Sequence, residues 1–90
     1  MNLYKFVWGT VNQPDTTVES LFIAAETEIN SLIGRQADFG ELYNYDGRGA
    51  GIFEEHQFEN MGVSSETVTE LLRVFDSSTL FGADPRQYID

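Results

Sequence analysis

The chain has 90 residues, of which 15 are Asp or Glu and 5 are Lys or Arg, so its formal net charge is −10. Chains of about 100 residues usually form one domain, and the hydrophobic content of 41% and the aromatic content of 13% are typical of a folding sequence. We therefore expect one compact acidic domain over residues 1–90. Nucleic-acid binders neutralise phosphates with clustered Lys and Arg, so this charge argues strongly against direct binding to DNA or RNA.

The sequence contains no cysteine, which excludes disulfide bonds, thiolate zinc sites and a cysteine nucleophile. No apolar run approaches the roughly 20 residues that a membrane helix needs, and residues 1–5 do not lead into the apolar segment of a signal peptide. We therefore expect a complete, soluble protein of the cytoplasm, without a membrane segment.

The first part of the chain predicts an antiparallel pair of strands. Residues 3–11 alternate, with Tyr4, Phe6 and Trp8 on one face, which is the pattern of a half-buried strand. Turn residues around Pro14 follow, and the β-rich run 18–24 predicts the second strand of a hairpin.

A short helix is expected from residue 25. Ile29, Leu32 and Ile33 share one face at the helical period, Glu26 and Glu28 favour the N-terminal end, and Gly34 is placed as a C-terminal cap.

The middle of the chain predicts further short strands. Alternate positions over residues 36–45 indicate a strand, and the glycine-rich residues 46–51 indicate a flexible hairpin turn. A strand restarts at 52–53, but the polar residues 54–57 interrupt it, so one bulged strand or two short strands both fit the pattern.

The C-terminal part predicts the clearest helix of the chain. Ser64 and Ser65 offer an N-cap, and apolar side chains from Val68 to Phe75 recur at helical spacing. Residues 80–81 predict a short edge strand, and Asp84 with Pro85 predicts one last helical turn. The order β-β-α-β-β-α predicts an α+β fold: a mainly antiparallel sheet of four to five strands with two helices on one face.

No catalytic, metal or cofactor site is expected. Residues 47–51 lack both a dinucleotide fingerprint and the Lys-Ser/Thr of a P-loop, so a turn explains their glycines better than a phosphate cradle does. His56 lies beside Glu54, Glu55 and Glu59, but a single histidine without cysteine is weak support for a metal site or a general base. The sequence therefore indicates a protein that is not an enzyme.

The segment 38–59 concentrates the negative charge, with six acids against the single base Arg48. Carboxylates at alternate positions of a strand lie about 6.6 Å apart, so they can imitate the regular line of anions that DNA presents. Two tyrosines lie beside the acids and could add apolar contact area. The predicted partner-binding residues are Asp38, Glu41, Tyr43, Tyr45, Asp46, Glu54, Glu55 and Glu59.

In size, charge and expected architecture the chain resembles the small acidic inhibitors of phages and mobile elements, such as anti-CRISPR and anti-restriction proteins, some of which mimic DNA. The resemblance implies stoichiometric inhibition, in which the acidic face occupies a positively charged nucleic-acid-binding surface of a defence complex. It comes without a motif, so no functional residue is carried over. The partner expected is a basic protein or protein complex, and the chain itself is expected to be a monomer or a homodimer.

Two alternatives remain open. An immunity or antitoxin-like protein that neutralises one basic nuclease would have the same size and charge. A soluble accessory domain is the other, since net charge by itself speaks only to solubility and long-range steering.

Overall fold

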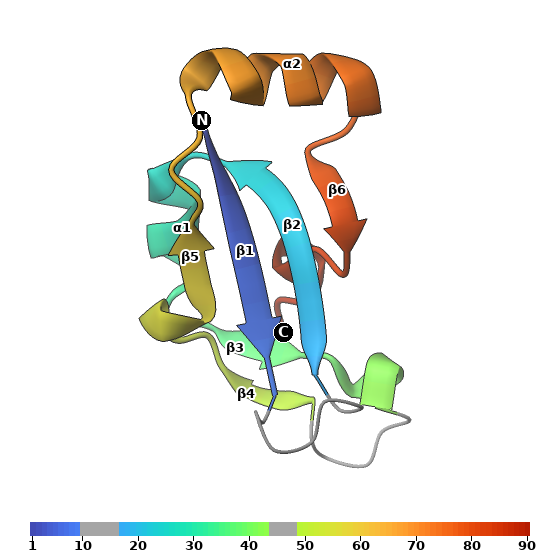
Figure 1. Cartoon of the computed structure of the whole chain (residues 1–90). Coiled ribbons are helices and arrows are strands. Elements are labelled where there is room, and N and C mark those ends of the chain that lie inside the picture. The colour runs from blue at the N-terminus through green and yellow to red at the C-terminus, as the bar shows by residue number, and fades with distance from the viewer. Residues whose placement is uncertain (10–16, 44–48) are drawn as a thin grey trace.

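The computed structural model of the protein describes residues 1–9, 17–43 and 49–90 (Figure 1). The turn expected around Pro14 lies outside the described residues, as do Tyr45, Asp46 and the first part of the turn expected over residues 46–51. Ala50 and Gly51, at the end of that expected turn, instead belong to a strand. In chain order the strands and α-helices are β1 (Asn2–Trp8), β2 (Val18–Ala24), α1 (Glu26–Leu32), β3 (Gln36–Asp38), β4 (Ala50–Ile52), β5 (Phe58–Asn60), α2 (Ser65–Phe75) and β6 (Thr79–Gly82). The described residues also form the short 3-10 helices η2 (Gly40–Tyr43), η3 (Glu55–Gln57) and η4 (Pro85–Gln87).

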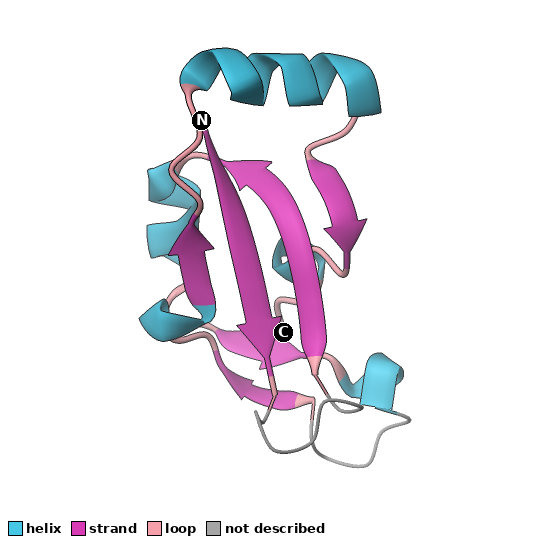
Figure 2. Ribbon diagram, viewed as in Figure 1, coloured by secondary structure: helices cyan, strands magenta, loops and turns pink. Residues whose placement is uncertain are grey.

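The predicted α+β fold is confirmed, with its strands divided between two sheets (Figure 2). The main sheet has four antiparallel strands in the order β5-β1-β2-β6, and β3 pairs with β4 in a separate ribbon. The predicted hairpin of the first two strands is present, with Asn2 opposite Ala24 and Trp8 opposite Val18.

One face of the main sheet carries an aromatic core. Tyr4, Phe6 and Trp8 of β1 are all buried, as their alternation predicts. The ring of Phe6 lies 5.8 Å from that of Phe39 and 5.9 Å from that of Phe53, centroid to centroid, so the segments around the β3–β4 ribbon close this face. From α1, Ile29 and Leu32 enter the same cluster. The residue that caps α1 at its C-terminus is Ile33, one position before the expected Gly34. Gly34 follows at a φ of +89°, in a turn in which the Arg35 N–H donates a hydrogen bond to the Leu32 carbonyl at 2.9 Å.

The position of α2 differs from the expectation that both helices lie on one face. Ser64 caps the helix by accepting a hydrogen bond from the Thr67 N–H at 3.2 Å, as the sequence predicts. However, α2 lies across the end of the sheet at which β1 begins and β2 ends (Figure 1). Val68 of α2 and Ile23 of β2 are buried without belonging to the main cluster, which indicates a second, smaller apolar cluster there. The physical reason is that α1 and the β3–β4 ribbon already cover the aromatic face.

The segment 36–45 is the clearest departure from the predicted strands. Its strand ends at Asp38, because the Asp38 carboxylate accepts a hydrogen bond from the Gly40 N–H at 2.8 Å and turns the chain into η2. Further on, residues 50–60 form two short strands in different sheets, which was one of the two arrangements that the sequence left open. Between these two strands the chain forms η3, in which the Gln57 side chain accepts a hydrogen bond from the Glu54 N–H at 2.9 Å.

The C-terminal elements match their predictions. β6 pairs with β2 at the edge of the main sheet, and η4 begins at Pro85, directly after its N-cap Asp84. None of the helices in the described ranges combines the length and the hydrophobicity that crossing a membrane requires.

Candidate functional site

The register of the β3–β4 ribbon separates the predicted partner-binding acids into two groups. Gln36 lies opposite Ile52 and Asp38 lies opposite Ala50, so the ribbon has two distinct ends. η3 follows the end at Ile52, whereas η2 follows the end at Asp38 (Figure 1). The acids of residues 38–41 and those of residues 54–59 therefore do not form one continuous row.

The group at residues 54–59 forms a compact acidic edge. We call Glu54, Glu55 and Glu59 the acid edge. All three side chains are exposed: Glu54 directly precedes η3, Glu55 is the first residue of η3, and Glu59 lies on β5. His56 lies within the acid edge, with its Nε2 3.6 Å from a carboxylate oxygen of Glu54, and pairs with that carboxylate only when protonated. Three carboxylates thus face solvent within six residues of chain.

The second group is smaller. Asp38 and Glu41 are exposed, but Tyr43 is buried with 5% of its surface accessible and belongs to the aromatic core. Its ring therefore packs inside the protein instead of lying beside the acids on the surface.

Few bases compensate the acid edge. Lys5 lies opposite Glu59 in the β1–β5 pair, and the Arg35 carbonyl accepts a hydrogen bond from the Phe53 N–H at 3.0 Å. Neither base forms an ion pair with any residue that the structure describes. Within the described part of the chain, Glu55 and Glu59 therefore have no ion-pair partner, and Glu54 has only His56.

A second charged centre, around Arg86, was not predicted from the sequence. The guanidinium donates to the Asp84 carboxylate at 2.7 Å, to a carboxylate oxygen of Glu28 at 3.2 Å and to the Ile23 carbonyl at 3.2 Å. Ser78 accepts a further hydrogen bond at 3.0 Å, and the guanidinium carbon lies 5.0 Å above the centre of the Phe22 ring. This single side chain therefore joins the C-terminal segment to α1, β2 and the turn before β6.

The Arg86 centre shifts the titration of both partners. Burial by itself raises the pKa of Asp84, but hydrogen bonds from Arg86 and from Thr79 outweigh burial and leave the pKa below its usual value. The hydrogen bond to Asp84 raises the pKa of Arg86. Because Asp84 is only 5% exposed and its charge is paired within the protein, this centre stabilises the fold and offers little to a partner.

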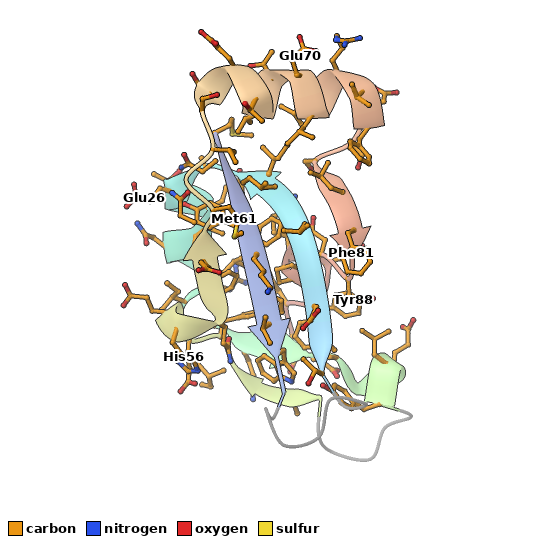
Figure 3. The ribbon with its side chains drawn as sticks, in the orientation of Figure 1. Glu26, His56, Met61, Glu70, Phe81 and Tyr88 are labelled. Carbon is orange, nitrogen blue, oxygen red and sulfur yellow. The ribbon has the colours of Figure 1, made fainter. Side chains whose placement is uncertain are left out.

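A groove of about 230 Å³ lies between α1 and the segment η3–β5, beside the acid edge. Glu26, Asn30 and Ile33 line it from α1 and the residue after the helix, and Glu55 and Phe58 line it from the other side. Figure 3 shows Glu26 and His56 on the same side of the molecule as β5. Among the described residues that line the groove, none is a base.

Over residues 1–9, 17–43 and 49–90, no group of three His, Asp or Glu side chains is placed to hold a metal ion.

Comparison of the chain with protein-family models, with curated proteins and with solved structures finds no match.

Proposed function

We propose that the protein is a stoichiometric inhibitor that binds a cationic, nucleic-acid-binding surface of a nuclease complex through its acid edge. The observation that carries the proposal is the set of three exposed carboxylates, Glu54, Glu55 and Glu59. The only basic side chain that the described structure places within ion-pair distance of them is His56, at 3.6 Å from Glu54. A surface of this kind attracts a basic protein over long distances and speeds the encounter between the two.

The local structure favours a binding surface over a merely solvated one. Glu54 and Glu55 are held by η3, in which the Gln57 N–H donates to the Glu54 carbonyl at 3.1 Å, and Glu59 is held by pairing of β5 with β1. The backbone positions of the three acids are thus fixed before binding, which lowers the entropic cost of ordering them against a partner. Half-buried Phe58, between Glu55 and Glu59 in the chain, supplies apolar area next to the charges.

To test the proposal, the tagged protein is used to capture the nuclease complex from its host, and the affinity of the protein for that complex is then measured. Replacing Glu54, Glu55 and Glu59 by Gln preserves side-chain size and removes three charges. At roughly 0.5–1 kcal/mol for each exposed charge pair, we expect the dissociation constant to rise about 10- to 150-fold. Inhibition of the purified nuclease should reach completion near one inhibitor per binding site.

The matched control removes three charges from α2, by replacing Glu66 and Glu70 with Gln and Asp76 with Asn. All three lie on or at the end of the helix at the far end of the main sheet from η3 (Figure 1). We expect a change of less than about threefold, because only long-range attraction is reduced. Equal losses in the two triple variants would contradict a docking role for the acid edge, and capture of one basic nuclease encoded beside the protein would favour the immunity-type alternative.

A further inference from the structure

The groove between α1 and β5 combines an apolar floor with acidic walls. Ile29, which is 5% exposed and belongs to the main aromatic cluster, and half-buried Phe58, which packs against that cluster, both line the groove. Glu26 and Asn30 rise from α1 on one side, and Glu55 lies on the other. At about 230 Å³ the groove is smaller than the roughly 300–1,000 Å³ of pockets that hold free small molecules, so its size suits one long side chain.

The polar groups of the groove are open for binding. The side chains of Glu26, Glu55 and Asn30 form no hydrogen bond or ion pair with any residue that the structure describes. Asn60, by contrast, has its side-chain oxygen engaged with the Gly62 N–H at 2.9 Å. Acceptors from opposite walls are therefore free above an apolar floor, which is complementary to a cation on an aliphatic stem.

We propose that this groove receives one arginine side chain of the partner protein, an inference that rests on the proposed function and names the anchor of that same interface. The aliphatic stem of the arginine lies on Ile29 and Phe58, and its guanidinium donates to the carboxylates of Glu26 and Glu55. Arginine fits better than lysine, because its planar head has five donors for acceptors on two walls, stacks on aromatic rings and is more weakly hydrated than an ammonium. Buried arginine is also among the residues that most often dominate protein interfaces.

The proposal can be tested without the partner, by titrating the isotope-labelled full chain with the blocked peptide acetyl-Gly-Arg-Gly-amide and following amide chemical shifts by NMR. We expect saturable shifts confined to the groove, including the side-chain amide of Asn30. The peptide in which citrulline replaces arginine has the same shape without the charge and should bind at least about tenfold more weakly, as should the chain with Glu26 and Glu55 replaced by Gln. The lysine peptide should bind more weakly than the arginine peptide.

Two further variants sharpen the result. Asn30→Asp adds a third carboxylate to the groove and should tighten arginine binding a few-fold, a gain that damage to the fold cannot mimic. The chain with Glu66 and Glu70 replaced by Gln loses two charges on α2 and should bind as the wild type does. Absence of saturable shifts, equal binding of the citrulline peptide, or equal losses in both double variants would overturn the proposal. Because the titration needs no nuclease, peptide binding in the groove would stand even if no nuclease partner existed, and failure of the titration would leave the acid edge untouched.

Discussion

Replacing Arg86 by Met tests whether this one side chain holds the C-terminal segment to the rest of the fold. Methionine keeps an unbranched apolar stem over Phe22 but removes every hydrogen bond of the guanidinium. Asp84 then remains buried, with only the Thr79 hydroxyl at 2.6 Å and the Arg86 backbone N–H at 2.9 Å as hydrogen-bond donors in the described structure.

The expected loss follows from the burial of the pair. Removing one partner of a buried ion pair costs about 3–5 kcal/mol. The side chain of Arg86 is 21% exposed and that of Glu28 is 43% exposed, so solvent screens part of the interaction, and we expect a loss of about 2–4 kcal/mol. A chain of this length has a total stability of about 5–13 kcal/mol, and its melting temperature falls by about 4–8 °C for each kcal/mol lost, so melting should occur about 8–32 °C lower.

The assay is urea unfolding followed by circular dichroism and by the fluorescence of Trp8. Arg73→Met is the matched control, because Arg73 pairs with Glu70 at 2.7 Å on the exposed surface of α2, with side chains 70% and 64% exposed. That control should change stability by less than about 0.5 kcal/mol. A loss below about 1 kcal/mol for Arg86→Met, or equal losses for the two variants, would refute the role assigned to the Arg86 centre.

Asp84 and Gly82 carry two further predictions on the stability of the fold. Because the pKa of Asp84 is lowered, the carboxylate contributes its full stabilisation when the pH is above the usual pKa of 3.8, and this stabilisation is lost as the pH falls through the lower pKa of the folded state. The urea concentration at the unfolding midpoint should therefore decrease in the wild type once the pH is below about 4, and it should decrease less in Asp84→Asn. Parallel plots of this midpoint against pH for the two proteins would contradict the assignment. Gly82→Ala should unfold far more easily than Gly62→Ala, because both glycines have a positive φ, of +75° and +70°, but only at Gly82 would the added Cβ overlap the Glu19 carbonyl oxygen. We expect a loss of about 1–2 kcal/mol at Gly62 from backbone strain and at least about 1–3 kcal/mol more at Gly82 from the overlap, measured by thermal unfolding, and equal losses would contradict the close approach of β6 to β2.

Local patterns in the sequence predict the elements whose burial depends on one face. The alternation of Tyr4, Phe6 and Trp8 predicts β1, and all three side chains are buried. The stripe beginning at Val68 predicts α2, but of its side chains only Val68 is buried, and Phe75 is 50% exposed. Gly34 likewise marks the end of α1 through its own conformational freedom.

Part of what the sequence does not predict depends on contacts between distant residues, and part on a local side-chain hydrogen bond that competes with the strand pattern. The hydrogen bond of Arg86 to Ile23 spans 63 positions of the chain, and no local pattern signals it. The strand expected over residues 36–45 gives way to η2, because the side chain of Asp38 bonds to the backbone and outweighs the alternation. The acids of residues 38–59 are exposed as expected where described, but their division into two groups depends on the register of β3 and β4.

The salt dependence of partner binding tests the central claim most directly. The dissociation constant of the captured nuclease complex is measured between about 0.05 and 0.5 M NaCl for the wild type and for the chain with Glu54, Glu55 and Glu59 replaced by Gln. If the acid edge docks on a cationic surface, wild-type binding weakens steeply with salt, and the variant shows a distinctly shallower slope that meets the wild type at high salt. Parallel slopes for the two proteins would contradict the account, because the partner would then not bind the charges of the acid edge.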